Sequence, residues 1–521
     1  MIPNESIFEK KNNISEKIDE LKKVLPKGEL LGLTFETEQN KYFYDTVTGK
    51  VMVCEEVEYR IFEFLLSGKV EDLYTLGKKY TSGFGNAIDS VLDAIKHEEL
   101  LSISKFERMT IPDNYEDLLN NKLNQVILEL TEKCNLRCGY CIYNDDCDNN
   151  RDFGTRDMSE EVAIKAIKYA FEHSKNSDDL HITFYGGEPL INYKLLKKCI
   201  NYSKELKSNN QNLFFSFTTN GVLMTKEIAE ELAKMKNISI MFSIDGPKHI
   251  HDLYRKDISG NGSFDRAIRG LQYVIESFGD QAEDSITLSM VYAPPFSTMK
   301  IEEIQTFFDD LKWLPAGIQK FISYPNEDSL ETISRYLSDQ NISLHASPNN
   351  GYDATLRDWS NTNYEKENLF SSRLVDESFM RIHQRSIFSK IIPNITLNGC
   401  CIPGQRRIYI TVDGEFKICE RVGSAPNIGD LNSGLNMESI KQTYLFGHRE
   451  QSQQKCSTCW LARLCDLCYV HSYDKGGFNA NKKARNCSVR KESYIKYLQR
   501  YFTLLEKNPN AFDYMGDLII T

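Results

Sequence analysis

Three cysteines in the spacing CxxxCxxC follow a short apolar run in the first third of the chain. The run spans residues 126–130, and the cysteines are Cys134, Cys138 and Cys141. A [4Fe–4S] cluster usually takes four Cys thiolates, so three thiolates leave one iron with an open coordination position. A small molecule can bind at such an iron and receive an electron. The motif therefore predicts an iron–sulfur site directly after a strand.

Two simpler interpretations of this motif stay open. Closely spaced cysteines can bind zinc, and three cysteines within eight residues can also occur by chance. A zinc site would need a fourth ligand, and the nearest candidate, Cys147, lies in a polar run of Asn and Asp.

The residues around the motif add a family resemblance. Tyr140 directly precedes the third cysteine, and Phe-Tyr-Gly-Gly-Glu-Pro occupies residues 184–189. Together these features resemble the radical S-adenosylmethionine (radical SAM) superfamily. The resemblance implies that the three cysteines hold a [4Fe–4S] cluster whose open iron binds the amino and carboxylate groups of SAM. It also implies that reductive cleavage of SAM yields a 5′-deoxyadenosyl radical, which takes a hydrogen atom from the substrate. In such enzymes the cofactors carry out the chemical step and the protein orients them.

The same resemblance assigns SAM contacts to the ends of later strands. Paired glycines let the backbone approach a ligand closely, and an arginine fork suits a carboxylate. Alternatives remain: Arg255 in a surface ion pair, Asp245 as a turn residue and Val291 in the core. The resemblance gives no residue acting as a catalytic acid or base. The expected SAM contacts are Tyr140, Gly186, Gly187, Glu188, Ser243, Asp245, Arg255 and Val291.

A second set of cysteines lies near the C-terminus and resembles the SPASM domain, which carries two auxiliary [4Fe–4S] clusters. Its last CxxC gap has two residues, whereas the family pattern commonly has three. A structural zinc domain is the alternative. The resemblance gives auxiliary cluster I the ligands Cys401, Cys419 and Cys468, with Cys400, another side chain or a substrate thiol as the fourth. It gives auxiliary cluster II the ligands Cys456, Cys459, Cys465 and Cys487.

The N-terminal region reads as short strands followed by helices, a winged helix-turn-helix pattern. Strand-like runs near residues 30–36 and 41–54 precede helical spacing at Val57, Ile61 and Phe64 and again at Ile88, Val91 and Ile95. This pattern is similar to the domain that recognises the leader peptide in enzymes modifying ribosomally made peptides, where the leader adds a strand to a sheet edge. A purely structural domain and a DNA-binding domain are the alternatives.

Strands and amphipathic helices alternate between residues 124 and 310, which implies a parallel sheet. The strand-like runs are 126–130, 180–185, 213–218, 239–244 and 285–292. The predicted fold class is α/β, a partial (β/α)6 barrel with the site at the carboxyl ends of its strands.

At 521 residues the chain should hold about three domains. The predicted segments are an N-terminal helix (1–27), a leader-recognition domain (28–108), a linker (109–123), the barrel (124–310), a bridging or lid segment (311–395), the SPASM domain (396–490) and a C-terminal helix with tail (491–521).

Composition and charge limit where this protein is expected to be located and which partners it is expected to bind. The net charge of −11 argues against a general nucleic-acid-binding face. The chain has neither a run of 18 apolar residues nor a signal-peptide layout, so we expect no membrane association. Its 14 cysteines without a secretion signal indicate metal ligation in a reducing cytoplasm, not disulfides.

These observations predict an enzyme that modifies a ribosomally synthesised precursor peptide, most simply by forming Cys thioether crosslinks. Its expected cofactors are three [4Fe–4S] clusters and SAM. Its expected partners are the precursor peptide and an electron donor of the flavodoxin or ferredoxin type. Carbon–carbon crosslinking, epimerisation and formylglycine formation are alternative reactions, and a non-catalytic, zinc-structured peptide-binding adaptor is the rival from another class.

Overall fold

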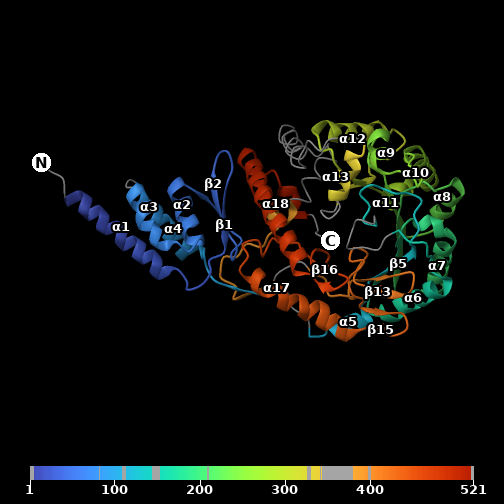
Figure 1. Cartoon of the computed structure of the whole chain (residues 1–521), viewed down its shortest axis with the longest axis horizontal. Coiled ribbons are helices and arrows are strands. Elements are labelled where there is room, and N and C mark those ends of the chain that lie inside the picture. Colours follow the sequence, from blue (N-terminus) through green and yellow to red (C-terminus); the bar gives the residue numbers. More distant parts are fainter. Residues whose placement is uncertain are drawn as a thin grey trace.

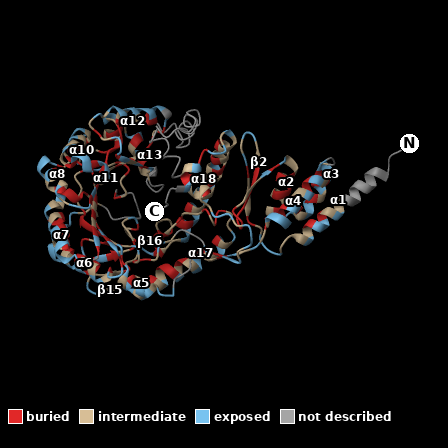
Figure 2. Ribbon diagram, turned by 180° about the vertical axis from the view of Figure 1, so that it is seen from behind, coloured by how far each residue is buried: buried red, intermediate tan, exposed pale blue. Residues whose placement is uncertain are grey.

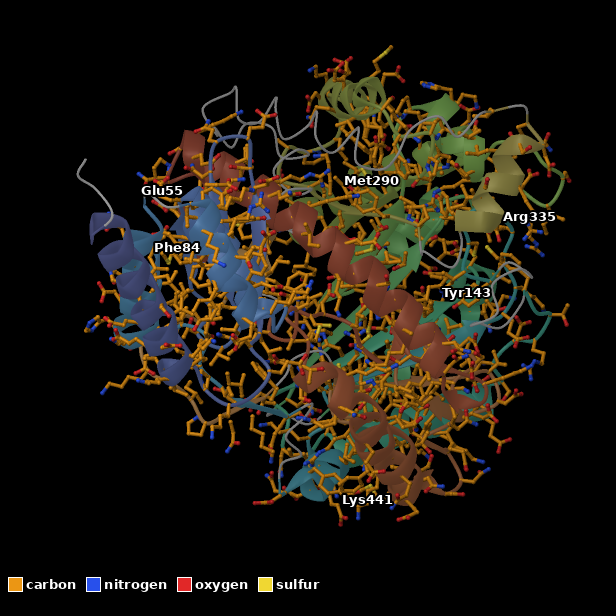
Figure 3. The ribbon with its side chains drawn as sticks, turned by 60° about the vertical axis from the view of Figure 1, so that its left-hand side comes forward. Glu55, Phe84, Tyr143, Met290, Arg335 and Lys441 are labelled. Carbon is orange, nitrogen blue, oxygen red and sulfur yellow. The ribbon has the colours of Figure 1, made fainter. Side chains whose placement is uncertain are left out.

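The computed structural model describes residues 5–80, 83–107, 113–143, 153–207, 211–325, 330–340, 342, 379–396 and 400–517. A small N-terminal unit and a large α/β body lie at opposite ends of the molecule, and the long helix α18 (Ala480–Lys507) lies between them (Figure 1). Figure 3 shows Glu55 and Phe84 of the small unit on one side and Met290 and Arg335 of the body on the other. Cys147 lies outside the described residues.

The N-terminal unit is a three-stranded antiparallel sheet covered by helices. Its core stacks Phe43 on Phe62, with ring centroids 4.0 Å apart. Because side chains alternate along a strand, the neighbouring Tyr42 faces the other way and contacts Phe502 of α18. The elements are α1 (Glu5–Val24), β1 (Gly32–Glu36), β2 (Lys41–Asp45), β3 (Val51–Cys54), α2 (Glu56–Leu66), α3 (Leu73–Lys79) and α4 (Phe84–Glu98).

The body contains six consecutive parallel strands in the order β10-β9-β8-β7-β6-β5. These strands are β5 (Gln125–Thr131), β6 (Asp179–Gly186), β7 (Asn212–Thr219), β8 (Ile238–Ser243), β9 (Ile286–Val291) and β10 (Gln319–Ser323). The intervening helices include α6 (Glu160–His173), α7 (Tyr193–Leu206), α8 (Lys226–Ala233), α9 (Lys248–Tyr254), α10 (Phe264–Phe278) and α12 (Thr298–Asp310). Figure 2 shows these helices burying one face toward the sheet and exposing the other.

Helix α6 illustrates why the sequence folds this way locally. Ser159 accepts a hydrogen bond from the backbone N–H of Val162 and so caps the first turn, where Glu160 and Glu161 also lie near the positive end of the helix dipole. Its alanines and Ile167 are buried against the sheet. The serine cap and the apolar face fix the start and the orientation of the helix.

The C-terminal region extends the same sheet from the other side of β5. Strand β12 (Arg407–Ile410) pairs in parallel with β5, and β13 (Glu415–Lys417), β14 (Gly429–Asp430) and β15 (Gly434–Leu435) follow as antiparallel strands. The result is one ten-stranded sheet. Other elements are β4 (Lys105–Glu107) paired with β11 (Asn394–Thr396), α5 (Tyr115–Asn121), α11 (Ala282–Ser285), α13 (Leu330–Ser338), α16 (Met437–Ser439), α17 (Gly447–Ser457), β16 (Tyr473–Asp474) and β17 (Gly477–Phe478).

Three boundaries differ from the sequence expectation. The parallel sheet continues to β10, beyond residue 310, although only Ile322 of this strand is buried and the apolar alternation is weak. The segment expected to be a linker contains helix α5. The C-terminal helix begins at Ala480, because Asn479 caps it, and its first two turns are polar and show no apolar periodicity.

Candidate functional site

The loop that carries Cys134, Cys138 and Cys141 leaves the carboxyl end of β5 and is fastened on both sides by backbone hydrogen bonds. On one side, the N–H of Gly187 donates to the Thr131 carbonyl at 2.8 Å, at the end of β6. On the other side, the N–H of Gly139 donates to the Tyr254 carbonyl at 3.0 Å, at the end of α9. The loop is therefore held over the carboxyl edge of the sheet.

The paired glycines at the end of β6 are needed for this approach. Gly186 has φ of 125°, in the region that favours glycine. A Cβ added at Gly187 would lie 2.1 Å from the Lys133 carbonyl oxygen. The glycines thus let the β6 loop pack directly against the backbone of the cysteine loop.

The Glu188 side chain is buried and bonded to neighbouring loops. Its carboxyl oxygens accept hydrogen bonds from the N–H of Leu190 at 3.0 Å, the hydroxyl of Thr219 at 2.8 Å and the N–H of Asn220 at 2.8 Å. Burial raises the pKa of this carboxyl to about 7, against the opposing effect of its three donors. The side chain of this expected SAM-contact residue therefore joins the ends of β6 and β7.

Asn220 connects this network to the cysteines, a contact that sequence reasoning did not assign. Its amide nitrogen donates to the Asn135 side-chain oxygen at 2.8 Å and lies 3.9 Å from the Cys134 sulfur. The only sequence signal is its place in Thr-Thr-Asn-Gly at the end of β7. Asn220 orients the first cysteine of the motif.

Asp245, just after β8, gathers three of the expected SAM contacts into one buried cluster. Its carboxylate accepts from Arg255 Nε at 2.9 Å and Nη2 at 3.0 Å, from the Val291 N–H at 3.0 Å and from the Tyr140 hydroxyl. Burial alone would raise the pKa of Asp245, but the Arg255 guanidinium reverses this and holds that pKa below its usual value. Ser243, at the end of β8, is also buried.

The structure overturns two of the simpler interpretations of these residues. Arg255 is 7% exposed and Asp245 2% exposed, so their ion pair is buried and not on the surface. Asp245 binds three side chains or backbone groups from other elements and is therefore more than a turn residue.

Two further titratable groups lie next to this cluster. The His251 ring accepts at Nδ1 from the Asp245 N–H at 3.4 Å, and its Nε2 lies 3.0 Å from the Ser263 hydroxyl. Burial lowers the pKa of His251 to about 4. Lys300 donates to the Ala293 carbonyl at 2.6 Å, and burial lowers the pKa of Lys300 to about 8 although Asp245 opposes the shift. A neutral imidazole and a buried amine thus flank the ion pair.

Aromatic rings cover the cysteine loop. Tyr140 contacts Tyr254 with ring centroids 5.2 Å apart, and Tyr254 stacks on Tyr336 of α13 at 5.5 Å. Cys138 packs against the same small core, which also includes Ile333 of α13. Helix α13, in the segment expected to be a bridge or lid, therefore lies against the loop.

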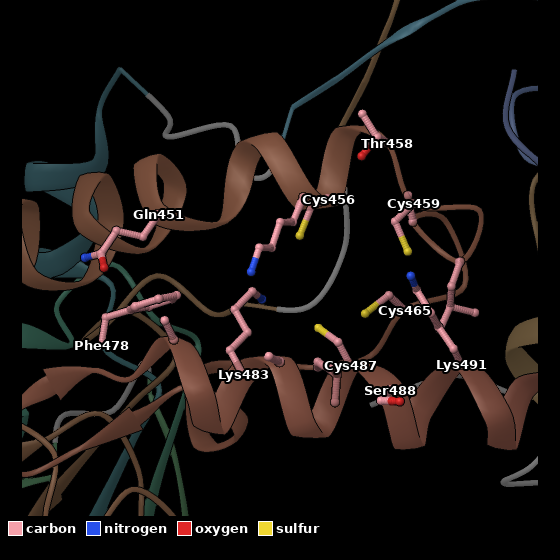
Figure 4. A pocket seen from close by; sticks show the side chains of 16 residues that line it. Gln451, Cys456, Thr458, Cys459, Cys465, Phe478, Lys483, Cys487, Ser488 and Lys491 are labelled. Atoms are coloured by element: carbon pink, nitrogen blue, oxygen red, sulfur yellow. The ribbon is translucent and has the colours of Figure 1, made fainter. Parts of the chain in front are cut away.

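Four of the C-terminal cysteines face one cavity. Cys456, Cys459, Cys465 and Cys487 line a cavity of about 440 Å³, and their sulfur atoms point toward its centre (Figure 4). They come from α17, the loop after it and α18. Lysines also line the cavity, and Lys483 is only 5% exposed.

The size of this cavity fits a group larger than one ion. Among the described residues, no three His, Cys, Asp or Glu side chains converge as they would on a single metal ion. Four thiols around a larger cavity are instead the donor set of a [4Fe–4S] cluster. The residues present therefore fit the expected cluster II.

The other C-terminal cysteines form a second group. Burial raises the pKa of Cys468, and Cys401 raises it further, while Cys419 has a pKa raised by burial and then by Glu420 and Cys468. The Cys468 thiol thus lies within electrostatic range of both Cys401 and Cys419. The adjacent Cys400 instead lies 3.8 Å from His448 Nδ1. Among the three expected ligands of cluster I, Cys468 is therefore the one close to both others, whereas Cys400 has a different neighbour.

Comparison with known proteins identifies the domain that holds the first cysteine motif. Residues 128–308 match the family model described as the radical SAM superfamily. The domain that carries the cysteine loop is therefore similar to the enzymes of this superfamily. The match covers the strands from β5 to β9 and includes the cysteine loop, the paired glycines and the Asp245–Arg255 pair.

Two relatives extend this comparison. A cysteine-type anaerobic sulfatase-maturating enzyme of Clostridium novyi is 34% identical over 152 residues, which is 29% of this chain and 40% of that protein. Another of the same name from Clostridium perfringens is 23% identical over 392 residues, covering 74% of this chain and 95% of that protein. An uncharacterized protein of Methanocaldococcus jannaschii is 32% identical over 157 residues; the chain spans only 40% of the Clostridium novyi protein and 50% of this one.

A solved structure shows the same fold. The structure titled Native anSMEcpe with bound AdoMet has a TM-score of 0.50 at 18% identity, covering 76% of this chain and 100% of that one. The likeness therefore extends past the radical SAM domain, although this level of identity establishes the fold alone. In the described part of the chain, no helix combines the length and the apolar character needed to cross a membrane.

Proposed function

We propose that this radical SAM enzyme modifies a ribosomally synthesised precursor peptide by forming Cys thioether crosslinks. One observation carries the proposal: the chain joins a three-cysteine radical SAM loop to a separate cavity lined by four cysteines. An enzyme with one three-cysteine cluster needs no such second site. A second redox centre suits a reaction in which a substrate radical must lose an electron.

The radical SAM loop provides the first binding site of the proposal. Cys134, Cys138 and Cys141 would hold a [4Fe–4S] cluster, and SAM bound there supplies a radical that removes a hydrogen atom from the peptide. The protein's part is to hold the loop over the sheet edge and to keep water away from it, as the buried contacts of Tyr140 and Asp245 do. Gly186, Gly187, Glu188, Ser243, Arg255 and Val291 complete the proposed SAM site.

The C-terminal cysteines provide the auxiliary sites of a proposed SPASM domain. Cys456, Cys459, Cys465 and Cys487 supply a full ligand set for cluster II. Cys401, Cys419 and Cys468 supply three ligands for cluster I, and the contact of Cys400 with His448 supports leaving the fourth position to a substrate thiol. A metal-bound thiol is deprotonated, and this prepares it for bond formation.

The N-terminal unit is proposed to bind the leader of the precursor peptide. Strand β3 lies at the edge of the small sheet, and Val53 on it is 59% exposed. An open edge strand can accept an added strand from a peptide. Electrons would come from a flavodoxin or ferredoxin-type donor, and we place the reaction in the cytoplasm.

Anaerobic sulfatase maturation, the oxidation of a protein residue to formylglycine, is the second candidate function. It is favoured by the names of the two Clostridium relatives. It differs from the first candidate in the product, because formylglycine formation joins no two residues of the substrate.

The first experiment tests radical SAM chemistry. Replacement of Cys134, Cys138 and Cys141 by Ala should abolish 5′-deoxyadenosine formation under anaerobic reduction and leave the C-terminal iron in place. The reconstituted wild type should hold about 12 iron and 12 sulfide per chain for three cubane clusters, whereas the adaptor alternative would hold zinc only. Cys199→Ala, a buried cysteine of α7, is the matched control and should keep full iron and activity. Undiminished SAM cleavage by the triple variant would refute the proposal.

The second experiment identifies the product. A precursor peptide encoded beside this gene is incubated anaerobically with the enzyme and SAM and analysed by mass spectrometry. A thioether predicts a loss of about two daltons per crosslink, from two hydrogen atoms removed, and a cysteine that no longer reacts with iodoacetamide. Full alkylation of every cysteine would exclude the thioether and favour another reaction.

A third experiment examines the N-terminal unit. Val53→Asp introduces a charge on the exposed edge strand and should weaken binding of the full precursor about tenfold, with SAM cleavage in the absence of peptide unchanged. Glu38→Gln, on the turn between β1 and β2, is the surface control. Unchanged peptide affinity in Val53→Asp would argue for a purely structural domain.

A further inference from the structure

A second cavity, of about 290 Å³, lies where three parts of the chain meet. Arg381 and Arg385 precede β11, Arg463 lies in the loop between Cys459 and Cys465, and all three line the cavity. Arg385 also reaches the turn between β2 and β3, because its Nε donates to the Gly49 carbonyl at 2.7 Å. The cavity thus borders the N-terminal unit and the loop of the proposed cluster II.

Two of the three arginines, Arg385 and Arg463, are held in place by backbone carbonyl groups. Arg463 donates to the Val47 carbonyl at 2.9 Å and to the Ser386 carbonyl, and it stacks over the Phe388 ring at 4.5 Å. Arg385 donates a second hydrogen bond to the Ile382 carbonyl at 2.5 Å. These acceptors are neutral carbonyl oxygens, which fix the side chains in place without cancelling their charge.

No carboxylate within the described ranges forms an ion pair with any of the three arginines. Asp45 acts on Arg463 electrostatically without an ion pair, and its oxygens already accept from the N–H and hydroxyl of Thr48 and from the N–H of Leu101. Burial lowers the pKa of both Arg385 and Arg463; for Arg463, Tyr44 and Asp45 oppose this shift and the Arg385 charge adds to it. Partly buried cations that form no ion pair are costly, and a bound anion would remove part of that cost.

We propose that this cavity binds an oxyanion, either a carboxylate or a phosphate, on the guanidinium groups of Arg381, Arg385 and Arg463. A guanidinium has five N–H donors in a planar fork that matches both groups. The carbonyl contacts use two donors each of Arg385 and Arg463. The volume is at the small end for ligand sites, so it fits one acidic group and excludes a whole nucleotide.

The shared chemistry has two sources that an experiment separates. The first source is a glutamate or aspartate side chain of the peptide substrate, because the cavity lies between the proposed leader-binding unit and the cluster loop. This source rests on the proposed function. A free inorganic anion is the second and is independent of it.

Calorimetry on the full-length, reconstituted protein tests the site at constant ionic strength. The probes are inorganic phosphate and N-acetyl-glutamate N-methylamide, with the corresponding capped glutamine as the neutral control. We expect saturable binding of at least one anion, with a dissociation constant on the order of 1 mM. Binding of phosphate alone indicates a free anion, and binding of the capped glutamate indicates a peptide carboxylate.

Arg381 provides the informative variant, because it makes no hydrogen bond or ion pair with the other described residues and its loss should not disturb the fold. Arg381→Gln should weaken anion binding about tenfold, and Arg381→Lys should weaken it less. Arg269→Gln, on the exposed side of α10, should leave it unchanged. No saturable anion binding by the wild type, equal binding of the capped glutamine, or wild-type affinity in Arg381→Gln would each overturn the proposal. Failure of SAM cleavage would not bear on it.

Discussion

Loss of the Asp245 charge should destabilise the radical SAM domain because it leaves Arg255 buried without a counter-ion. Asp245→Asn keeps the shape and one acceptor oxygen, but it removes the charge that two guanidinium hydrogen bonds, of 2.9 and 3.0 Å, now meet. Breaking a buried pair in this way costs about 3–5 kcal/mol. Native-state hydrogen exchange of the amides in residues 245–255 should then accelerate about 100-fold or more, since 1.4 kcal/mol is a factor of ten.

The double variant Asp245→Asn/Arg255→Gln separates this cause from a general loss of packing. It removes both charges, so it should be more stable than Asp245→Asn alone by at least about 1 kcal/mol. If hydrogen exchange in the double variant is accelerated by the product of the accelerations in Asp245→Asn and Arg255→Gln, the two changes act independently. That result would refute the reasoning.

The effect of pH gives a second check on the same pair. The folded-state pKa of Asp245 is lowered, so its contribution to stability is present above the unfolded pKa of about 3.9 and is lost as pH falls through the lower folded value. The difference between wild type and Asp245→Asn should therefore stay constant from about pH 5 to pH 7, below the range in which Lys300 titrates, and shrink below about pH 4. A difference that changes between pH 5 and pH 7 would point to another group.

Three further predictions follow from single contacts. Burial raises the pKa of Glu188 to about 7, so the wild type should lose stability relative to Glu188→Gln as pH rises from about 4.5 to 7. Urea unfolding should show a loss of about 3 kcal/mol at most. A difference in stability that stays constant with pH would contradict this. Gly187→Ala places a methyl group against the Lys133 carbonyl and should cost about four of twelve irons on reconstitution, whereas Gly516→Ala, which meets nothing within 4 Å, should cost none. Lys483→Met removes a positive charge from the wall of the four-cysteine cavity and should lower the midpoint potential of its cluster by on the order of tens of millivolts in a redox titration, with exposed Lys496→Met unchanged.

The local sequence was sufficient to locate the cysteine motif and most of the sheet. CxxxCxxC and the paired glycines depend only on neighbours along the chain, and the five strand-like runs between residues 126 and 292 all coincide with observed strands. Their apolar side chains are buried by the helices on the sheet, and this burial is what the sequence pattern records.

Long-range pairing decided the remaining elements. Strand β10 has one buried residue and is held in the sheet by its register with β9, which no local pattern reveals. Cys487 faces the cavity because Asn479 starts α18 early and places this cysteine on its second turn. From the sequence, the four cysteines that line this cavity could be assigned to one site only through a family resemblance.

The buried charged groups show most clearly which features follow from the sequence alone and which depend on tertiary packing. From its sequence neighbours, Arg255 could equally pair with the acids beside it on the surface, yet it meets Asp245 because α9 folds back over β8 and buries both. Arg381, Arg385 and Arg463 carry no sequence motif and are separated by up to 82 residues, and only the packing of the N-terminal turn, β11 and the cluster loop brings them to one cavity. Residue type and spacing determined which groups can bind a cofactor, and tertiary packing determined which charges are buried together, because the cost of burying a charge depends on what surrounds it.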